Sequence, residues 1–158
     1  MQPAPLQQLN GAPMIRLLVV ENQPAIRRGL QMWLGLAPDL TVLGRAGDGL
    51  AALWHAALSR PDIILVHLES VDLNARLIAA MRRTAPVSHV VVLSLHDDAL
   101  TRRRVLGAGA AAFVSMHEVK EHLLQAIRQA AARPPAEAER EQRSAEALRH
   151  AEESRMPL

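Results

Sequence analysis

The sequence predicts an α/β fold in which helices cover both faces of a five-stranded parallel sheet. Short apolar runs alternate with longer stretches whose apolar residues recur every three or four positions. The apolar runs are continuous and rich in Val, Ile and Leu, which is typical of strands buried on both faces. The chain has 158 residues and is 49% hydrophobic, so it is long enough for one domain and a tail.

The first two strand–helix units occupy the N-terminal third of the pattern. Residues 15–20 form the first apolar run, and a proline suits the start of the helix predicted over residues 25–36. Residues 40–45 are predicted as the second strand. Asp48 lies in a Gly-Asp-Gly turn, and we expect its carboxylate to cap a helix through residues 50–58.

The third unit and the fourth strand follow the same pattern. A Pro-Asp pair precedes the apolar run at residues 63–68, and a helix is predicted over residues 72–83. Residues 89–95 form the fourth apolar run. The next helix is expected to begin at a cap supplied by Asp97 or Asp98.

Glycine ends this fourth helix, at Gly107 or Gly109. Residues 110–115 are predicted as a short fifth strand, and residues 117–132 as a strongly periodic helix. Strict alternation of buried strands and amphipathic helices implies right-handed crossovers. About 120 residues of this pattern fit the flavodoxin-like, doubly wound strand order 2-1-3-4-5.

In such a sheet, ligands bind beyond the carboxyl ends of the strands, where the strand order reverses. The residues at the ends of the first, third and fourth strands therefore surround one pocket, together with the residue after the fifth strand. These residues are Glu21, Asn22, His67, Ser94 and Met116.

The two ends of the chain differ in composition from the predicted domain over residues 14–132. Residues 1–13 are rich in Pro and Gln and are predicted to be a disordered extension. Residues 133–158 are predicted to be a charged helical tail, supported by ion pairs worth about 0.2–0.5 kcal/mol each. Either this tail is a solvated, frayed helix, or it pairs with a partner or with its own copy.

Composition excludes several classes of function. The net charge is only +2 and arginines are interleaved with acids, so we expect no direct nucleic acid binding. The absence of cysteine excludes disulfides and thiolate chemistry. The chain lacks both a secretory signal and an apolar run long enough to span a membrane, so the expected location is the cytoplasm.

The sequence resembles the receiver domains of two-component response regulators, above all those of the NarL/LuxR type. The resemblance covers about residues 14–132 and implies the CheY-like fold and a role in signal transduction or transcription regulation. Its motifs are IRLLVVENQPAIRRGLQMWL (15–34), LGRAGDGLAAL (43–53), PDIILVHL (61–68), VVVLSLHDD (90–98) and LGAGAAAFVSM (106–116).

The resemblance implies that an aspartate accepts a phosphoryl group beside Mg²⁺ held by acidic residues. Glu21 matches the first acidic position, whereas Asn22 stands where a second acid is usual. His67 stands where the acceptor aspartate is expected, and Met116 where a lysine binds the phosphoryl group. The chain is therefore predicted to be a degenerate receiver with no catalytic residue, weak or absent Mg²⁺ binding and no enzyme activity.

Two further positions correspond to the switch of the family. Ser94 matches the hydroxyl that contacts the phosphoryl group, and Phe113 matches the aromatic switch residue. Without a phosphoryl group, we expect Ser94 to be a satisfied strand-end hydroxyl and Phe113 to be fixed in the core. Met116 is expected to pack against Phe113 or the pocket rim.

His67 has three interpretations. It fills the acceptor site while bonded to Glu21 or Asn22, it forms a pH-sensitive pair with Glu21, or it binds a metal or a phosphoryl group. The predicted function is phosphorylation-independent protein–protein interaction. The alternatives are a small-ligand or metal sensor, or a receiver phosphorylated on a residue other than aspartate.

The expected partner is a protein, such as a regulator or a kinase. The resemblance also implies a homodimer, formed through the face of the fourth helix, fifth strand and fifth helix, or through the tail. Arg102, Arg103 and Arg104 lie on that face, as a solvated surface or as part of the contact.

Overall fold

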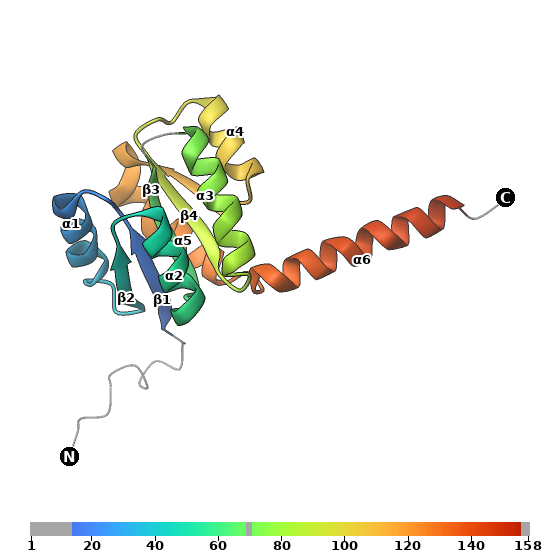
Figure 1. Ribbon diagram of the computed structural model, residues 1–158, viewed down its shortest axis with the longest axis horizontal. Helices are drawn as coiled ribbons and strands as arrows, with labels where there is room; N and C mark the ends of the chain where they lie inside the picture. Colours follow the sequence, from blue (N-terminus) through green and yellow to red (C-terminus); the bar gives the residue numbers. More distant parts are fainter. Residues whose placement is uncertain (1–13, 69–70, 156–158) are drawn as a thin grey trace, which may run out of the picture.

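The computed structural model describes residues 14–68 and 71–155, and the predicted extension over residues 1–13 lies outside them. Five parallel strands form one sheet in the order β2-β1-β3-β4-β5, as predicted (Figure 1). The strands are β1 (Ile15–Val20), β2 (Leu40–Ala46), β3 (Ile63–Leu68), β4 (His89–Ser94) and β5 (Ala112–Ser115). The helices are α1 (Pro24–Leu34), α2 (Gly49–Ser59), α3 (Val71–Thr84), α4 (Ala99–Gly107), α5 (Leu124–Ala131) and α6 (Ala136–Arg155).

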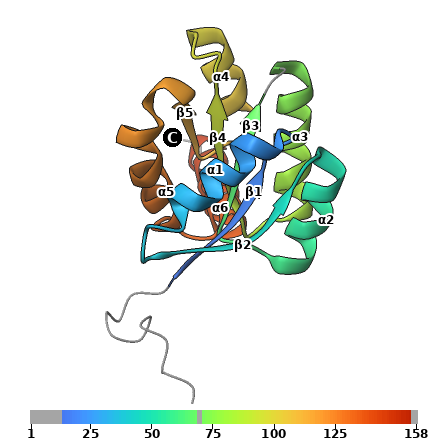
Figure 2. The same ribbon diagram turned by 90° about the vertical axis from the view of Figure 1, so that its left-hand side faces the viewer.

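Two apolar layers enclose the sheet, one on each face. Alternate strand residues point to opposite faces, so Leu18 packs toward α2, α3 and α4, whereas Leu17 packs toward α1 and α5. Figure 2 shows α2 and α3 on one side of the sheet and α5 on the other. This double cover explains why the central strands are apolar at nearly every position.

The predicted helix starts at Asp48 and Asp98 are confirmed. Asp48 accepts a hydrogen bond from the backbone N–H of Ala51 at 2.7 Å. Of the two candidates for the fourth helix, Asp98 is the cap, and it accepts from both the N–H and the hydroxyl of Thr101. These hydrogen bonds lower the pKa of the Asp98 carboxyl.

Several predicted boundaries were wrong by one or two residues. Helix α1 ends at Leu34 rather than Leu36, because the N–H of Leu36 bonds one turn back to Trp33 in a tighter geometry and Pro38 follows. The fourth strand ends at Ser94, one residue earlier than predicted, and the fifth begins at Ala112. Gly109, with a φ of 112°, makes the turn before that strand.

The segment before α5 is also less regular than the predicted helix over residues 117–132. A 3₁₀ turn (Met116–Glu118) leads into a π-helical segment (Val119–Leu123) before α5 begins. Leu123, Ile127 and Ala130 nevertheless face the core.

Helix α6 projects away from the rest of the chain (Figure 1), and its residues 141–155 are exposed. The linker before it is fixed by His89, whose buried ring bonds through Nε2 to the carbonyl oxygen of Pro134 at 2.7 Å. Within the described residues, none of the helices is long and apolar enough to cross a membrane.

Candidate functional site

The carboxyl ends of the strands bring the predicted site residues to one edge of the sheet. Glu21 directly follows β1, His67 is the second-to-last residue of β3, and Ser94 ends β4. In the register, Leu68 pairs with Ser94, and Ser94 pairs with Ser115 at the end of β5. Met116 comes next along the chain. The topology therefore creates the edge that the sequence predicted.

Glu21 and His67 are in direct contact at this edge. Nδ1 of His67 is hydrogen-bonded to Oε2 of Glu21, and the two side chains are 2% and 0% exposed, respectively. The other carboxylate oxygen of Glu21 accepts from the backbone N–H of Gln23 at 2.9 Å. The Arg27 guanidinium donates to the main-chain carbonyl of Glu21 at 3.0 Å. This contact is common to the first two interpretations of His67, since both pair its ring with Glu21.

The second ring nitrogen of His67 has a different environment. Nε2 is buried and, among the described residues, has no hydrogen-bond partner. When Nδ1 carries the proton donated to Glu21, neutral His67 presents a lone pair at Nε2. That atom can accept a hydrogen bond or bind a metal. The carboxylate of Glu21 is already bonded to Nδ1 of the same ring.

Ser94 is buried, and its hydroxyl is used within the turn that follows β4. Its Oγ accepts a hydrogen bond from the N–H of His96 at 3.1 Å. Ser115 makes the equivalent turn after β5, where its Oγ donates to Oδ2 of Asp97 and accepts from the N–H of His117, both at 3.2 Å. Sequence reasoning missed Ser115, although its place at a strand end was a signal that could have identified it.

Phe113 and Met116 lie in opposite layers of the core. Phe113 is buried in the layer of α2, α3 and α4, and the guanidinium carbon of Arg102 lies 4.9 Å from its ring centroid. Met116 is half-buried against the layer of α1 and α5. Met116 therefore packs away from Phe113, while the core position expected for Phe113 agrees with the structure.

The donor atoms at this edge do not fit Mg²⁺. Hard cations take oxygen ligands, and here an imidazole occupies one oxygen of the buried Glu21 carboxylate. Asn22 is exposed. Across the described residues, no group of three or more His, Asp or Glu side chains is placed to hold a metal ion.

The family model for the response regulator receiver domain matches residues 17–128. The nitrate/nitrite response regulator NarL of Escherichia coli K12 is 29% identical over 117 residues, which cover 73% of this chain and 54% of NarL. A protein-glutamate methylesterase/protein-glutamine glutaminase of a Nocardioides strain is 31% identical over 130 residues, 73% of this chain and 36% of that protein. The chain thus spans about half the length of NarL and about a third of the length of the methylesterase. The second of these relatives is named as an enzyme.

Solved structures share the fold. The receiver domain of NarL from Mycobacterium tuberculosis matches with a TM-score of 0.69 and 28% identity, covering 77% of this chain and 100% of that domain. RcsB from Salmonella enterica, solved bound to the promoter rprA, matches with a TM-score of 0.67 and 16% identity. The match covers 75% of this chain and 99% of the RcsB chain. This last likeness concerns the fold alone. The expectation of no direct nucleic acid binding stays a prediction.

Proposed function

The chain belongs to the response regulator receiver domain family, and we propose that it is an atypical receiver that binds protein partners without being phosphorylated. The observation that carries this proposal is the buried contact between His67 and Glu21. An imidazole takes the strand position where the family places its acceptor carboxylate. The carboxylate next to it is already engaged by the ring and by the N–H of Gln23.

The charges needed for phosphoryl transfer are also reduced. Phosphoryl transfer depends on cations that neutralise the crowded phosphate oxygens. Met116 supplies no charge where the family has a lysine, and its side chain packs toward α1 and α5. Asn22 supplies no carboxylate for a metal ion. In this proposal the domain over residues 14–132 has no enzyme activity and needs no Mg²⁺.

Signal transduction then depends on contacts with other proteins in the cytoplasm, for example a kinase or a regulator. The α4–β5–α5 face and α6 are the surfaces expected to contact a partner protein. Helix α4 exposes Arg102, Arg103 and Arg104 on one short segment. This local positive charge favours a partner with an acidic surface.

Intact-mass measurement after incubation with acetyl phosphate and Mg²⁺ tests the proposal. A receiver that has the acceptor aspartate serves as the positive control in the same reaction. We expect this chain to keep its mass while the control gains a phosphoryl group. A stoichiometric adduct on this chain would overturn the proposal, and its stability in acid and alkali would then distinguish phosphohistidine from acyl phosphate or phosphoserine.

The buried Nε2 of His67 favours a second candidate function, a ligand or metal sensor. A ligand with a hydrogen-bond donor, or a metal ion, would satisfy this atom. Thermal unfolding of the wild type and His67→Gln in the presence of Zn²⁺ tests this alternative. Stabilisation of the wild type alone would support a sensor, whereas equal curves for the two proteins would count against it.

A further inference from the structure

Helix α2 exposes a continuous apolar stripe on the side that faces away from the sheet. Leu50, Trp54 and Leu58 are 81%, 67% and 69% exposed. Their spacing of four residues places them on one face of the helix, one turn above the other. The opposite face of the same helix buries Ala52 and Ala56 completely.

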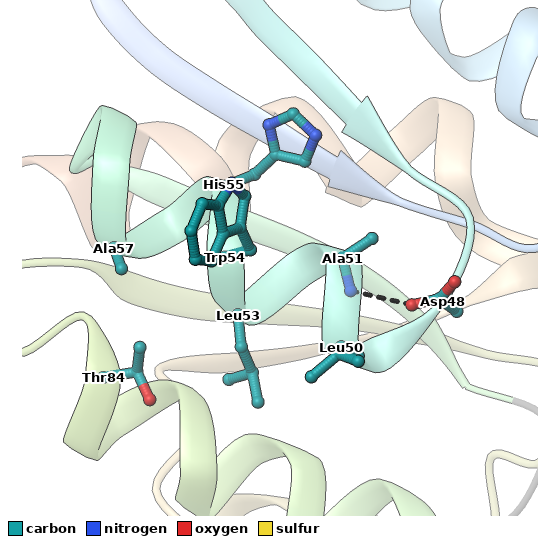
Figure 3. A pocket seen from close by; sticks show the side chains of 8 residues that line it. All are labelled: Asp48, Leu50, Ala51, Leu53, Trp54, His55, Ala57 and Thr84. Carbon is teal, nitrogen blue, oxygen red and sulfur yellow. Dashed lines mark hydrogen bonds between the residues drawn. The ribbon is translucent and has the colours of Figure 1, made fainter.

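The composition of α2 indicates that this outer face is covered in the working protein. Gly49–Ser59 contains no Asp, Glu, Lys or Arg. A helix that is apolar on all sides is normally buried on all sides, whereas a surface helix carries charges on its outer face. Beside the stripe, a cavity of about 680 Å³ is lined by α2 residues, including Leu53 and Ala57, and by Thr84 of α3. Figure 3 shows Leu50 and Leu53 on the side of α2 toward α3, with Trp54 and His55 farther from it.

We propose that this face binds a second copy of the chain, with the two α2 helices antiparallel across a two-fold axis at Trp54. The stripe is symmetric about Trp54, because Leu50 and Leu58 each lie four residues away. An antiparallel pair therefore brings Trp54 against Trp54 and Leu50 against Leu58 of the second copy. This self-complementarity is what an isologous two-fold contact requires.

A second copy fits this face better than it fits helix α4. Two copies of α4 across a two-fold axis would bring Arg102, Arg103 and Arg104 close to the same arginines, and like charges repel. Helix α2 carries no such charge. At roughly 1.5 Å per residue, its 11 residues span only a short contact, so we expect a weak dimer that forms as concentration rises. The inference goes beyond the proposed function, and its test uses no phosphodonor.

Sedimentation of the full chain over a concentration series tests the interface. We expect a monomer–dimer equilibrium whose dissociation constant rises at least about tenfold in Trp54→Glu, as for a buried aromatic hot spot. The chain provides two matched controls, since Leu148 is 67% exposed on α6 and Leu36 is 81% exposed after α1. Leu148→Glu and Leu36→Glu should leave the equilibrium unchanged. Circular dichroism checks that each variant is folded.

Three results would overturn the proposal. They are a wild type that stays monomeric at every concentration, a dimer that Trp54→Glu leaves intact, and a dimer that Leu148→Glu dissociates, which would place the contact on α6. Because the chain has no cysteine, disulfide trapping tests the antiparallel orientation. A mixture of Leu50→Cys and Leu58→Cys chains should cross-link faster than either variant alone, whereas equal rates would contradict the two-fold arrangement.

Discussion

His67 bonds through Nδ1 to the carboxylate of Glu21, and this contact joins the ends of β1 and β3 within the protein interior. Because both side chains are buried, neither can replace the lost partner with water when the other is removed. A buried polar group without a partner costs about 1–3 kcal/mol. The pair is therefore part of the stability of the domain.

The energetic coupling of this pair is the first prediction. We expect Glu21→Ala and His67→Ala each to lower the free energy of unfolding by about 1–3 kcal/mol. The double variant should lose less than the sum, because it leaves neither polar group unpaired. Urea unfolding of the four proteins gives the coupling energy, and additive losses would show that the contact contributes little.

The second prediction concerns the stability and phosphorylation of the variant His67→Asp. The new carboxylate would lie against Glu21, and like charges at this distance destabilise the fold at neutral pH. Mg²⁺ should recover part of the lost stability, since two carboxylates supply oxygen ligands. We expect little phosphorylation by acetyl phosphate, because Asn22 and Met116 are unchanged.

Thermal unfolding with and without Mg²⁺, followed by intact-mass measurement, checks both parts of this prediction. His67→Asn is the matched control, since it has the same shape without the charge. Efficient phosphorylation of His67→Asp would mean that the substitutions at Asn22 and Met116 do not limit the chemistry.

Local patterns in the sequence were sufficient to predict the sheet. The buried strands are continuous apolar runs and Asp48 caps its helix through its own side chain, so both depend on neighbouring residues in the chain. The π-helical segment Val119–Leu123 was not predicted, because its periodicity resembles that of an α-helix and its backbone depends on packing against the domain. The choice between Glu21 and Asn22 as the partner of His67 likewise required three-dimensional geometry, since both follow the same strand.

The linker before α6 leads to the third prediction. Removing residues 136–158 should leave the free energy of unfolding within about 0.5 kcal/mol of the full chain, because residues 141–155 of α6 are exposed. Removing residues 134–158 also deletes the carbonyl oxygen that pairs with buried His89. That truncation should cost about 1–3 kcal/mol more.

Chemical denaturation of the two truncated chains measures this difference directly. Equal stabilities would show that His89 finds another partner when Pro134 is absent. The same two proteins test α6 as an assembly element, since a drop in oligomer mass common to both would assign assembly to residues 136–158.

The ion pair between Asp39 and Arg128 gives the fourth prediction. Arg128 of α5 donates two hydrogen bonds, at 2.8 and 3.0 Å, to the carboxylate of Asp39 just before β2. The side-chain hydrogen bond from Arg128 lowers the pKa of Asp39 from its ordinary value of 3.8. A lowered folded-state pKa means that the pair stabilises the fold above the unfolded pKa and that this contribution disappears as pH falls through the folded pKa.

We therefore expect Asp39→Asn to lower the free energy of unfolding near neutral pH and to have little effect in strong acid. Both side chains are partly exposed, at 35% for Asp39 and 48% for Arg128, so solvent limits the loss to about 0.2–1 kcal/mol. Urea unfolding of wild type and variant across the acid range measures the difference. High salt should shrink it at neutral pH, because ions screen exposed charges. A difference that persists below the folded pKa of Asp39 would mean that the substitution acts through packing rather than through charge.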